Sequence, residues 1–395
     1  MTAPPRTRTS PTPGGLSTRR LSLPGSAPVE FGPGAVHALP EVLAGLGARR
    51  VVVVSDAGVR AAGVLDRVLA PLDAAELEVV VFDDVHANPS TDDVVAGAAA
   101  ARPLLESGSD DVAVLAVGGG SALDVAKGVG LLAGGTSLAE LLAGGEAPGL
   151  PLVAVPTTAG TGAETNGFAV LADPAGHRKI YLGAQSVRPK VSVLDPELTL
   201  GVPAGVTAAT GMDALTHGIE SLASRGSSPL SEAYATRAVT MVGGHLERAV
   251  ADGTDLEARS RLLFGAHLAG LALTLSGLGL VHGIAHAVTG HTGAAHGLAL
   301  SAVLDTVMEA SAPAAADAYR DVAVAMDAGR SAGDAVDAVR ALAEAVGARR
   351  SLSGLGLGEA MLPTVAADAL ADAVSRNAPW LPDEVALTDL LSARL

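Results

Sequence analysis

Short apolar runs alternate with alanine-rich stretches of helical periodicity through the first half of the chain. The helical stretches include residues 59–72 and 91–107, and β-branched residues dominate the runs between them. Apolar runs separated by helices are typical of parallel strands whose sheet is covered on both faces. The pattern therefore predicts a doubly wound, Rossmann-like α/β domain over residues 21–203. The expected strands are residues 50–55, 77–82, 111–117, 150–155 and 191–195.

The pattern changes after residue 203. Residues 204–395 show Ala- and Leu-rich helical periodicity broken by glycines, which predicts a second, all-helical domain. Residues 262–304 contain no Asp, Glu, Lys or Arg and are long enough to span a membrane. They also contain five of the ten histidines, which are costly in lipid. We therefore expect buried helices at the centre of the helical domain.

Composition narrows the class of protein. Hydrophobic residues make up 49% of the chain but aromatic residues only 2%, so the cores must consist of Ala, Val and Leu. Residues 1–20, rich in Pro, Thr, Ser and Arg, predict a disordered tail, with a transit peptide as the alternative. The net charge of −16 argues against nucleic acid and anionic membrane as partners. The absence of cysteine excludes disulfides and Cys-ligated metals and is consistent with a cytoplasmic location.

A glycine-rich turn follows the third expected strand. Gly118, Gly119 and Gly120 permit close approach of a ligand, and the helix after them presents free N–H groups to phosphate. The spacing matches neither G-x-G-x-x-G nor a Walker loop. A purely structural interpretation stays open, in which Ser121 is the N-cap of the helix and Asp124 completes a capping box.

A second polar turn, VPTTAGTGAE at residues 155–164, follows the next expected strand. Its hydroxyl groups belong to Thr157, Thr158 and Thr161. Here too a capping box is the alternative, formed by Thr161 with Glu164. Open α/β sheets bind nucleotides at the carboxyl ends of their strands, so the two turns together favour a nucleotide site.

Asp56 ends the first expected strand, in VVVVSD. A carboxylate at this place can accept a hydrogen bond from a ribose hydroxyl and would repel a 2′-phosphate, which favours NAD over NADP. The alternative is that Asp56 is only the N-cap of the next helix.

Several histidines share helix faces. Asp213 and His217 are four residues apart in GMDALTHGIE, as are His282 and His286 in VHGIAHAV, and His296 follows. Any one of them alone would be read as an ordinary core histidine. His282, His286 and His296 lie in the segment without charged residues, and the helix of Asp213 and His217 precedes it. A shared divalent cation is the simplest way to satisfy so many imidazoles in a dry interior. A carboxylate with imidazoles suits Fe²⁺ or Zn²⁺ better than Mg²⁺ or Ca²⁺.

In combination, these motifs resemble the iron-containing (group III) alcohol dehydrogenase family over nearly all of the chain after residue 20. The resemblance implies a Rossmann-like domain, a helical domain and a metal in the cleft between them. The matching segments are FGPGAV (31–36), VVVVSD (51–56), Asn88-Pro89, GGGSALDVAK (118–127), PTTAGTGAE (156–164), DPELT (195–199), GMDALTHGIE (211–220) and the histidine segment 282–296.

The resemblance also implies roles for single residues. The metal would be held by Asp213, His217, His282 and His296. His286 would be a further active-site histidine, and its place one turn from His282 makes it the candidate for proton transfer. The chain departs from the family between His286 and His296, where His291 is an unexpected polar group. The nicotinamide cofactor would contact Asp56, Asn88, Gly118, Gly119, Gly120, Ser121, Asp124, Thr157, Thr158, Thr161 and Lys179.

We therefore predict an alcohol dehydrogenase, or an aldehyde reductase in the reverse direction, linked to NAD(H), with NADP as the alternative. A catalytic Fe²⁺, or Zn²⁺ instead, would act as Lewis acid on a small alcohol or carbonyl. We expect a homodimer. One alternative is a maleylacetate reductase-like enzyme, for which Arg178, Arg188 or Lys190 would have to reach the substrate. The others are a dehydroquinate synthase-like lyase and a non-catalytic metal- or nucleotide-binding protein.

Overall fold

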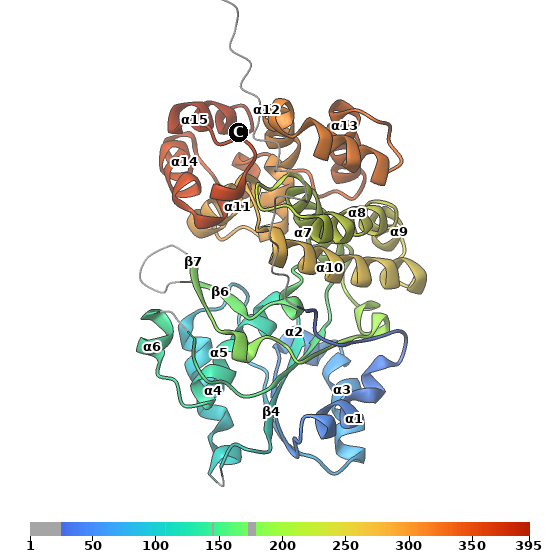
Figure 1. The fold of residues 1–395 in the computed structure, drawn as a ribbon, viewed down its shortest axis with the longest axis vertical. Coiled ribbons are helices and arrows are strands. Elements are labelled where there is room, and N and C mark those ends of the chain that lie inside the picture. The colour runs from blue at the N-terminus through green and yellow to red at the C-terminus, as the bar shows by residue number, and fades with distance from the viewer. Residues whose placement is uncertain (1–24, 107, 144–145, 173–178) are drawn as a thin grey trace, which may run out of the picture.

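The computed structural model describes residues 25–395 apart from 107, 144–145 and 173–178. The tail expected at residues 1–20 lies outside the described residues. An α/β part and a helical part are stacked along the long axis of the molecule (Figure 1). Strands occur only in the first part of the described chain, and from Ala204 onward its secondary structure is helical.

Within the described part of the chain, six strands form a parallel sheet in the order β1-β8-β5-β4-β2-β3. They are β1 (Val29–Phe31), β2 (Arg50–Val54), β3 (Glu78–Phe82), β4 (Val112–Gly118), β5 (Leu152–Pro156) and β8 (Val191–Leu194). The helices that cover the sheet are α1 (Leu39–Gly45), α3 (Val64–Ala74), α4 (Thr91–Leu105) and α5 (Gly120–Ala133).

The side chains of β2 show why its sequence is continuously apolar. Val52 and Val54 belong to the core formed with α4 and α5, whereas Val51 and Val53 belong to the core formed with α1 and α3. Successive residues of a strand face opposite sides of a sheet, so a strand with helices on both sides must be apolar throughout. The doubly wound α/β prediction is confirmed.

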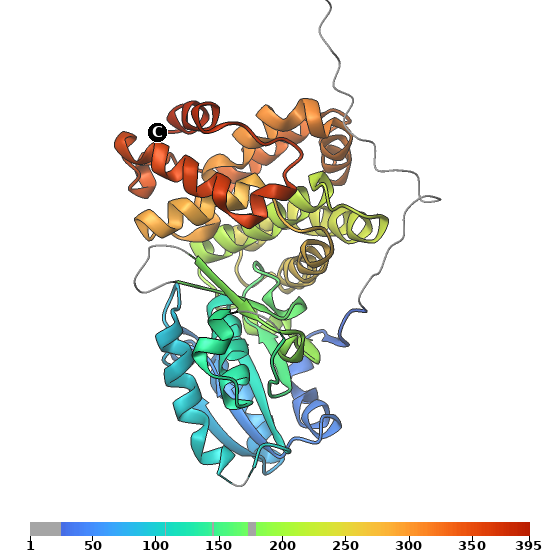
Figure 2. The same ribbon diagram turned by 60° about the vertical axis from the view of Figure 1, so that its left-hand side comes forward.

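Some local structure differs from the predicted pattern. The helix expected over residues 59–72 is two helices, α2 (Ala57–Ala61) and α3, because Gly63 between them has a φ of 68°. An antiparallel hairpin of β6 (Phe168–Ala172) and β7 (Lys179–Gly183) lies outside the main sheet. Both views show this hairpin between the sheet and the helical part (Figures 1 and 2). The remaining elements of the first part are α6 (Leu138–Ala143) and the 3₁₀ helices η2 (Ala35–Ala38), η3 (Ala163–Thr165), η4 (Gln185–Val187) and η5 (Pro196–Thr199).

The helical part encloses a core in which alanine, valine and leucine predominate. Its α-helices are α7 (Ala204–Ala223), α8 (Pro229–Gly243), α9 (Leu246–Ala251), α10 (Leu256–Ser276), α11 (Leu280–Thr292), α12 (His296–Ala325), α13 (Ala332–Ala345), α14 (Leu362–Ala371) and α15 (Glu384–Ser392). Its 3₁₀ helices are η6 (Ser353–Leu355), η7 (Glu359–Met361) and η8 (Ala373–Asn377). Small residues let these helices approach closely: a Cβ at Gly297 would collide with the carbonyl group of Ala209. Gly297 thereby allows the first turn of α12, which carries His296, to lie against α7.

The apolar segment 262–304 forms most of α10, all of α11 and the start of α12. Helix α12 is long and apolar enough to cross a membrane, but 61% of its apolar stretch is buried inside the protein. Helices α10 and α11 meet at a bend of 105°. Such burial is typical of helices in a protein core, which agrees with the expected placement of this segment.

Candidate metal and cofactor site

A cavity of about 620 Å³ extends from the glycine turn to the histidines. Gly120, Ser121 and Thr161, from the two polar turns, line part of it. Its walls also include the four predicted metal ligands, Asp213, His217, His282 and His296, and the predicted proton carrier His286. The two turns meet because β4 and β5 are neighbours, with Gly118 opposite Pro156. The cavity is therefore large enough and suitably placed to hold a nicotinamide beside the histidines.

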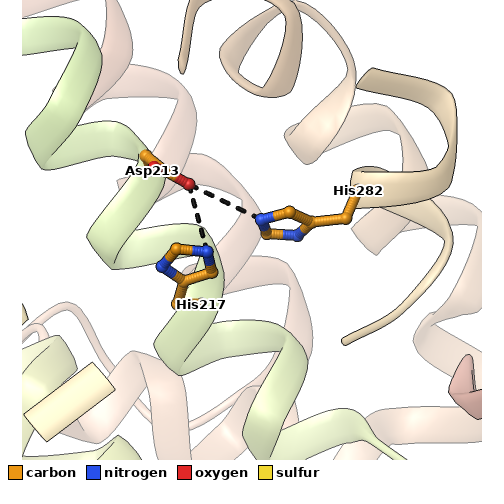
Figure 3. Close-up of side chains that lie close together, drawn as sticks. All are labelled: Asp213, His217 and His282. Carbon is orange, nitrogen blue, oxygen red and sulfur yellow. Dashed lines mark ion pairs between the residues drawn. The ribbon is translucent and has the colours of Figure 1, made fainter. Parts of the chain in front are cut away.

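Asp213, His217 and His282 form a buried cluster (Figure 3). Asp213 and His217 lie one turn apart on α7, and His282 reaches them from α11. The Oδ1 atom of Asp213 is 3.2 Å from Nε2 of His217 and 3.5 Å from Nε2 of His282. One ligand atom from each of the three residues lies within 4.8 Å of the others, which is the arrangement that a shared cation requires.

The polar atoms of this cluster suit a divalent cation. Asp213 Oδ1 and His282 Nε2 are buried and have no hydrogen-bond partner among the described residues, which is costly unless another group satisfies them. Burial lowers the pKa of His217 to about 4, against the opposing charge of Asp213. Burial would also raise the pKa of Asp213, but the surrounding histidines hold it well below its ordinary range. An ionised carboxylate beside a neutral imidazole is a donor set that Fe²⁺ and Zn²⁺ accept.

His296 lies at the open side of the cluster. Its Nε2 atom is 3.9 Å from Oδ1 of Asp213, and its side chain is 30% exposed. Its ring is stacked on that of His286, with centroids 5.2 Å apart, and lies 5.5 Å from that of His282. The structure therefore brings the predicted fourth ligand next to the other three, although outside the tight group of three.

Glu220 is a functional candidate that the sequence analysis missed. Its Oε2 accepts hydrogen bonds from His282 Nδ1 at 2.6 Å and from the Gly279 N–H at 2.9 Å, and its Oε1 accepts one from the Val281 N–H at 2.7 Å. Although burial lowers the pKa of His282, the carboxylates of Glu220 and Asp213 raise it to about 9. Glu220 thus holds Nδ1 of His282, so that Nε2 faces Asp213. The only local sign of this role in the sequence is the place of Glu220 in GMDALTHGIE, one turn after His217.

His286 lies beside the cluster and contacts residues from two other segments. Its Nδ1 is 2.8 Å from Oδ2 of Asp372 and 3.1 Å from the hydroxyl oxygen of Tyr181. Burial alone would raise the pKa of Asp372, but the hydrogen bond and charge of His286 lower it. Asp372 and Tyr181 were not predicted, since neither stands in a recognisable motif.

The glycine turn has the open backbone that the sequence predicts. Gly118 has a φ of 151°, and a Cβ there would lie 2.7 Å from that of Ala122. A Cβ on Gly120 would lie 2.6 Å from Cγ2 of Thr161. The capping-box interpretation is wrong: α5 begins at Gly120 with Gly119 as its N-cap, and no side chain of the described residues caps it. The first N–H groups of α5 therefore stay available for an anion.

The second polar turn also lacks the capping box. Thr161 accepts a hydrogen bond from the Ala163 N–H at 3.3 Å, but Glu164 instead binds His267 Nδ1 at 3.0 Å. Thr157 is buried, and Thr158 has its hydroxyl 3.3 Å from the Cβ position of Gly119.

Asp56 serves as the N-cap of α2, as the alternative reading expected. Its Oδ1 accepts a hydrogen bond from the Val59 N–H at 3.0 Å. Its Oδ2 lies 3.3 Å from the Cβ position of Gly118, so the carboxylate also faces the glycine turn. Asn88 lines the cavity and has a φ of 54°. Lys179 begins β7, but its side chain lies outside the described part of the structure.

Asp124 lines the cavity but binds other protein groups. Its Oδ2 accepts a hydrogen bond from the Val170 N–H at 3.0 Å, and its Oδ1 accepts one from Lys127 at 3.2 Å. Lys127 is fully buried and also donates to Asn166 Oδ1 at 3.1 Å and to the Phe168 carbonyl at 2.6 Å. Burial lowers the pKa of Lys127, and Asp124 opposes that shift. The pair therefore attaches β6 to α5 at the wall of the cavity.

His291 lies apart from the metal cluster. Its Nε2 is 2.7 Å from Oδ2 of Asp368 on α14, in a partly exposed hydrogen bond. The polar group that departs from the family therefore has a surface partner and does not line the cavity.

Comparison with known proteins tests the predicted family. The family model described as "Iron-containing alcohol dehydrogenase" matches residues 26–196, and "Fe-containing alcohol dehydrogenase family, C-terminal" matches residues 207–395. The chain belongs to the iron-containing alcohol dehydrogenase family. Its fold class and its activity as a metal-dependent oxidoreductase acting on alcohols are thus as the sequence predicts.

Individual members of the iron-containing alcohol dehydrogenase family align over most of the chain. An NAD-dependent methanol dehydrogenase of Bacillus methanolicus is 36% identical over 271 residues, which are 68% of this chain and 70% of that protein. A 1,3-propanediol dehydrogenase of Citrobacter freundii is 36% identical over 301 residues, 75% of this chain and 76% of that protein. The crystal structure of a 1,3-propanediol oxidoreductase matches with a TM-score of 0.89 at 33% identity, covering 95% of this chain and 100% of that one.

Proposed function

We propose that this iron-containing alcohol dehydrogenase interconverts small neutral alcohols and aldehydes with NAD(H), using one Fe²⁺ held by Asp213, His217 and His282, with His296 as fourth ligand. The observation that carries the proposal is the buried cluster of ligand atoms within 4.8 Å of one another, at the wall of a cavity that reaches the glycine turn. Zn²⁺ is the alternative metal, since the donor set suits both ions.

The chain binds, orients and shields the reactants. The free N–H groups at the start of α5 bind the cofactor pyrophosphate, and Asp56 accepts a hydrogen bond from its ribose. When bound, the cation supplies Lewis acidity to the substrate oxygen and the nicotinamide supplies or accepts hydride. His286 exchanges the hydroxyl proton through Nε2, because its Nδ1 is held by Asp372. Apolar residues such as Leu273 and Val374 exclude water from the cavity.

The preference for a neutral substrate rests on the side chains around the cavity. Among the lining residues that the structure describes, none is Arg or Lys. Of the three cations that this alternative requires, Arg188 donates to the Thr165 carbonyl at 3.1 Å, Lys190 is exposed and does not line the cavity, and Arg178 lies outside the described residues. A dicarboxylate such as maleylacetate would have its charges desolvated without a partner, which is costly. The maleylacetate reductase-like alternative is therefore less well supported.

We also propose that the enzyme is a cytoplasmic homodimer. The lack of cysteine suits a reducing compartment. Within the described chain, β1 ends the main sheet and has one free edge, and such an edge can pair with a second copy. Light scattering coupled to gel filtration tests the dimer; a monomeric mass at micromolar concentration would contradict it.

A substrate screen tests the proposed function. The Fe²⁺-loaded protein should oxidise NADH with neutral aliphatic aldehydes and reduce NAD⁺ with the matching alcohols. Turnover with carboxy- and phosphono-aldehydes should be at least about tenfold lower, because a desolvated charge without a partner costs more than about 1.4 kcal/mol. Preference for the anionic aldehydes would contradict the neutral substrate class. No turnover with any aldehyde or alcohol would contradict the proposed function itself.

A further inference from the structure

We propose that Tyr181 and Asp372 are positioning residues for His286, which they hold from two opposite parts of the molecule. The inference rests on the proposed function in that it takes His286 as the group that moves the proton. Tyr181 belongs to β7 in the α/β part, whereas Asp372 lies between α14 and η8 in the helical part. The contact therefore joins the two walls of the cavity beside the metal cluster.

Asp372 fixes which nitrogen of His286 faces the substrate. Both side chains are largely buried, with exposed fractions of 11% for His286 and 12% for Asp372. Oδ1 of Asp372 accepts a hydrogen bond from the Val374 N–H at 3.0 Å, which makes Asp372 the N-cap of η8 and fixes the carboxylate. Its Oδ2 is then free to accept from Nδ1 of His286 at 2.8 Å. A carboxylate at Nδ1 selects the Nδ1–H tautomer and leaves Nε2 as the acceptor in the neutral ring.

Tyr181 completes the arrangement from the other side. Its hydroxyl oxygen is 3.1 Å from Nδ1 of His286 and 3.4 Å from both carboxylate oxygens of Asp372. Because the proton on Nδ1 is directed at the carboxylate, the phenol donates its own proton to Asp372. The ring of Tyr181 meets that of His286 edge-on, with centroids 6.3 Å apart. The His286 ring is thus restrained both by a charged acceptor and by an aromatic neighbour.

The position of Tyr181 depends on the helix that follows the glycine turn. In the hairpin, Tyr181 stands opposite Val170. The Val170 N–H donates to Asp124 on α5 at 3.0 Å, and Lys127, also on α5, donates to the backbone of β6 at 2.6 Å. The hairpin is therefore fixed to α5, the helix proposed to bind the cofactor. Through these contacts, the position of Tyr181 depends on the position of α5, and the orientation of the His286 ring depends on Tyr181.

The test is a double-mutant cycle on the full-length, metal-loaded enzyme. Tyr181→Phe removes only the hydroxyl group and Asp372→Asn removes only the charge, and each is also combined with His286→Ala. Tyr234→Phe, which removes a phenol on α8 in the helical core, is the matched control and should keep the wild-type kcat. Metal content, melting temperature, kcat and the KM for NADH are measured on every variant.

The expected result is a loss of kcat that depends on His286. Tyr181→Phe should lower kcat by about 3- to 10-fold, as for one lost hydrogen bond. Asp372→Asn should lower it by about 10- to 100-fold, as for a lost partner of an active-site histidine. Metal content and the KM for NADH should stay unchanged. In the His286→Ala background neither substitution should lower kcat further, since residues that act as one unit are not additive.

In the kinetic experiment, two results would overturn the inference: wild-type kcat in either single variant, or the same loss of kcat with and without His286. A second readout needs no turnover. In Zn²⁺-loaded protein labelled with ¹⁵N-histidine, the His286 signal should show a protonated Nδ1 in the wild type and a changed tautomer in Asp372→Asn; an unchanged tautomer would also refute it. An inactive wild type contradicts the proposed function, whereas an active wild type with additive losses contradicts only this inference.

Discussion

Glu220→Gln is the substitution that tests most sharply how the metal cluster is held. Glu220 is buried and accepts three hydrogen bonds, from His282 Nδ1 and from the N–H groups of Gly279 and Val281. Those two N–H groups stand at the start of α11, whose N-cap residue has no side-chain cap of its own. Glu220 on α7 therefore caps α11 and also orients His282 in the first turn of that helix. Glutamine has the same size as glutamate but lacks the negative charge on which both roles depend.

The magnitude follows from these contacts. Glutamine keeps one carbonyl oxygen that can accept a hydrogen bond. Its NH2 group replaces the other oxygen and would face a group that is itself a donor, either a backbone N–H or the imidazole N–H. Loss of the hydrogen-bond partner of a metal-ligating histidine weakens metal binding by about 10- to 100-fold, or about 1.4–2.7 kcal/mol. Loss of the helix cap should also lower the free energy of unfolding of the metal-free protein by about 0.5–2 kcal/mol.

Metal affinity is measured by competition with a chelating indicator, and the stability of the metal-free protein by urea denaturation. Glu247→Gln, the same substitution at an exposed position on α9, is the matched control and should leave both values unchanged. If Glu220→Gln binds metal as tightly as wild type while the control behaves as expected, then Glu220 does not hold the ligand and our reading of the site is wrong.

The remaining predictions concern the proposed ligands, the proton carrier and the cofactor preference. His217→Ala, His282→Ala and His296→Ala should each lose bound metal, measured by elemental analysis, and most turnover while staying folded, because each removes one of four ligands; a variant with full metal content contradicts the assignment of that residue. His286→Ala should retain its metal while kcat falls by about 10²-fold or more, the effect of a lost general acid or base; loss of metal would instead make His286 a ligand. Asp56→Gly should narrow the preference for NADH over NADPH, read from the ratio of the two kcat/KM values; a tenfold preference of the wild type for NADPH would contradict the role of Asp56.

Local sequence signals predict much of the α/β part. Strand β2 is recognisable because its alternate side chains enter two different cores, which demands a continuously apolar run. The glycine turn at 118–120 is recognisable because a Cβ at Gly118 or Gly120 would collide with its neighbours. The strand β1 is not predicted, since its three residues give too little periodicity to interpret, and the hairpin β6–β7 is not predicted because it lies outside the alternation of strand and helix that marks the main sheet.

The part of the site that the sequence does not predict depends on distant contacts. Helical spacing places Asp213 and His217 on one face, and the same rule places His282 beside His286. No local pattern shows that Asp372 reaches His286 across 86 positions, or that Glu220 reaches His282 across 62. These carboxylates are identified only when the packing of α11 against its neighbours is known.

The central claim is that the buried cluster holds the metal on which alcohol turnover depends. The direct measurement removes metal from the full-length protein with a chelator under anaerobic conditions and titrates Fe²⁺ back while NADH oxidation with a neutral aldehyde is followed. We predict almost no turnover without metal, and a linear recovery that saturates at one Fe²⁺ per chain. Full turnover in the metal-free protein, or recovery without bound Fe²⁺, would contradict the claim.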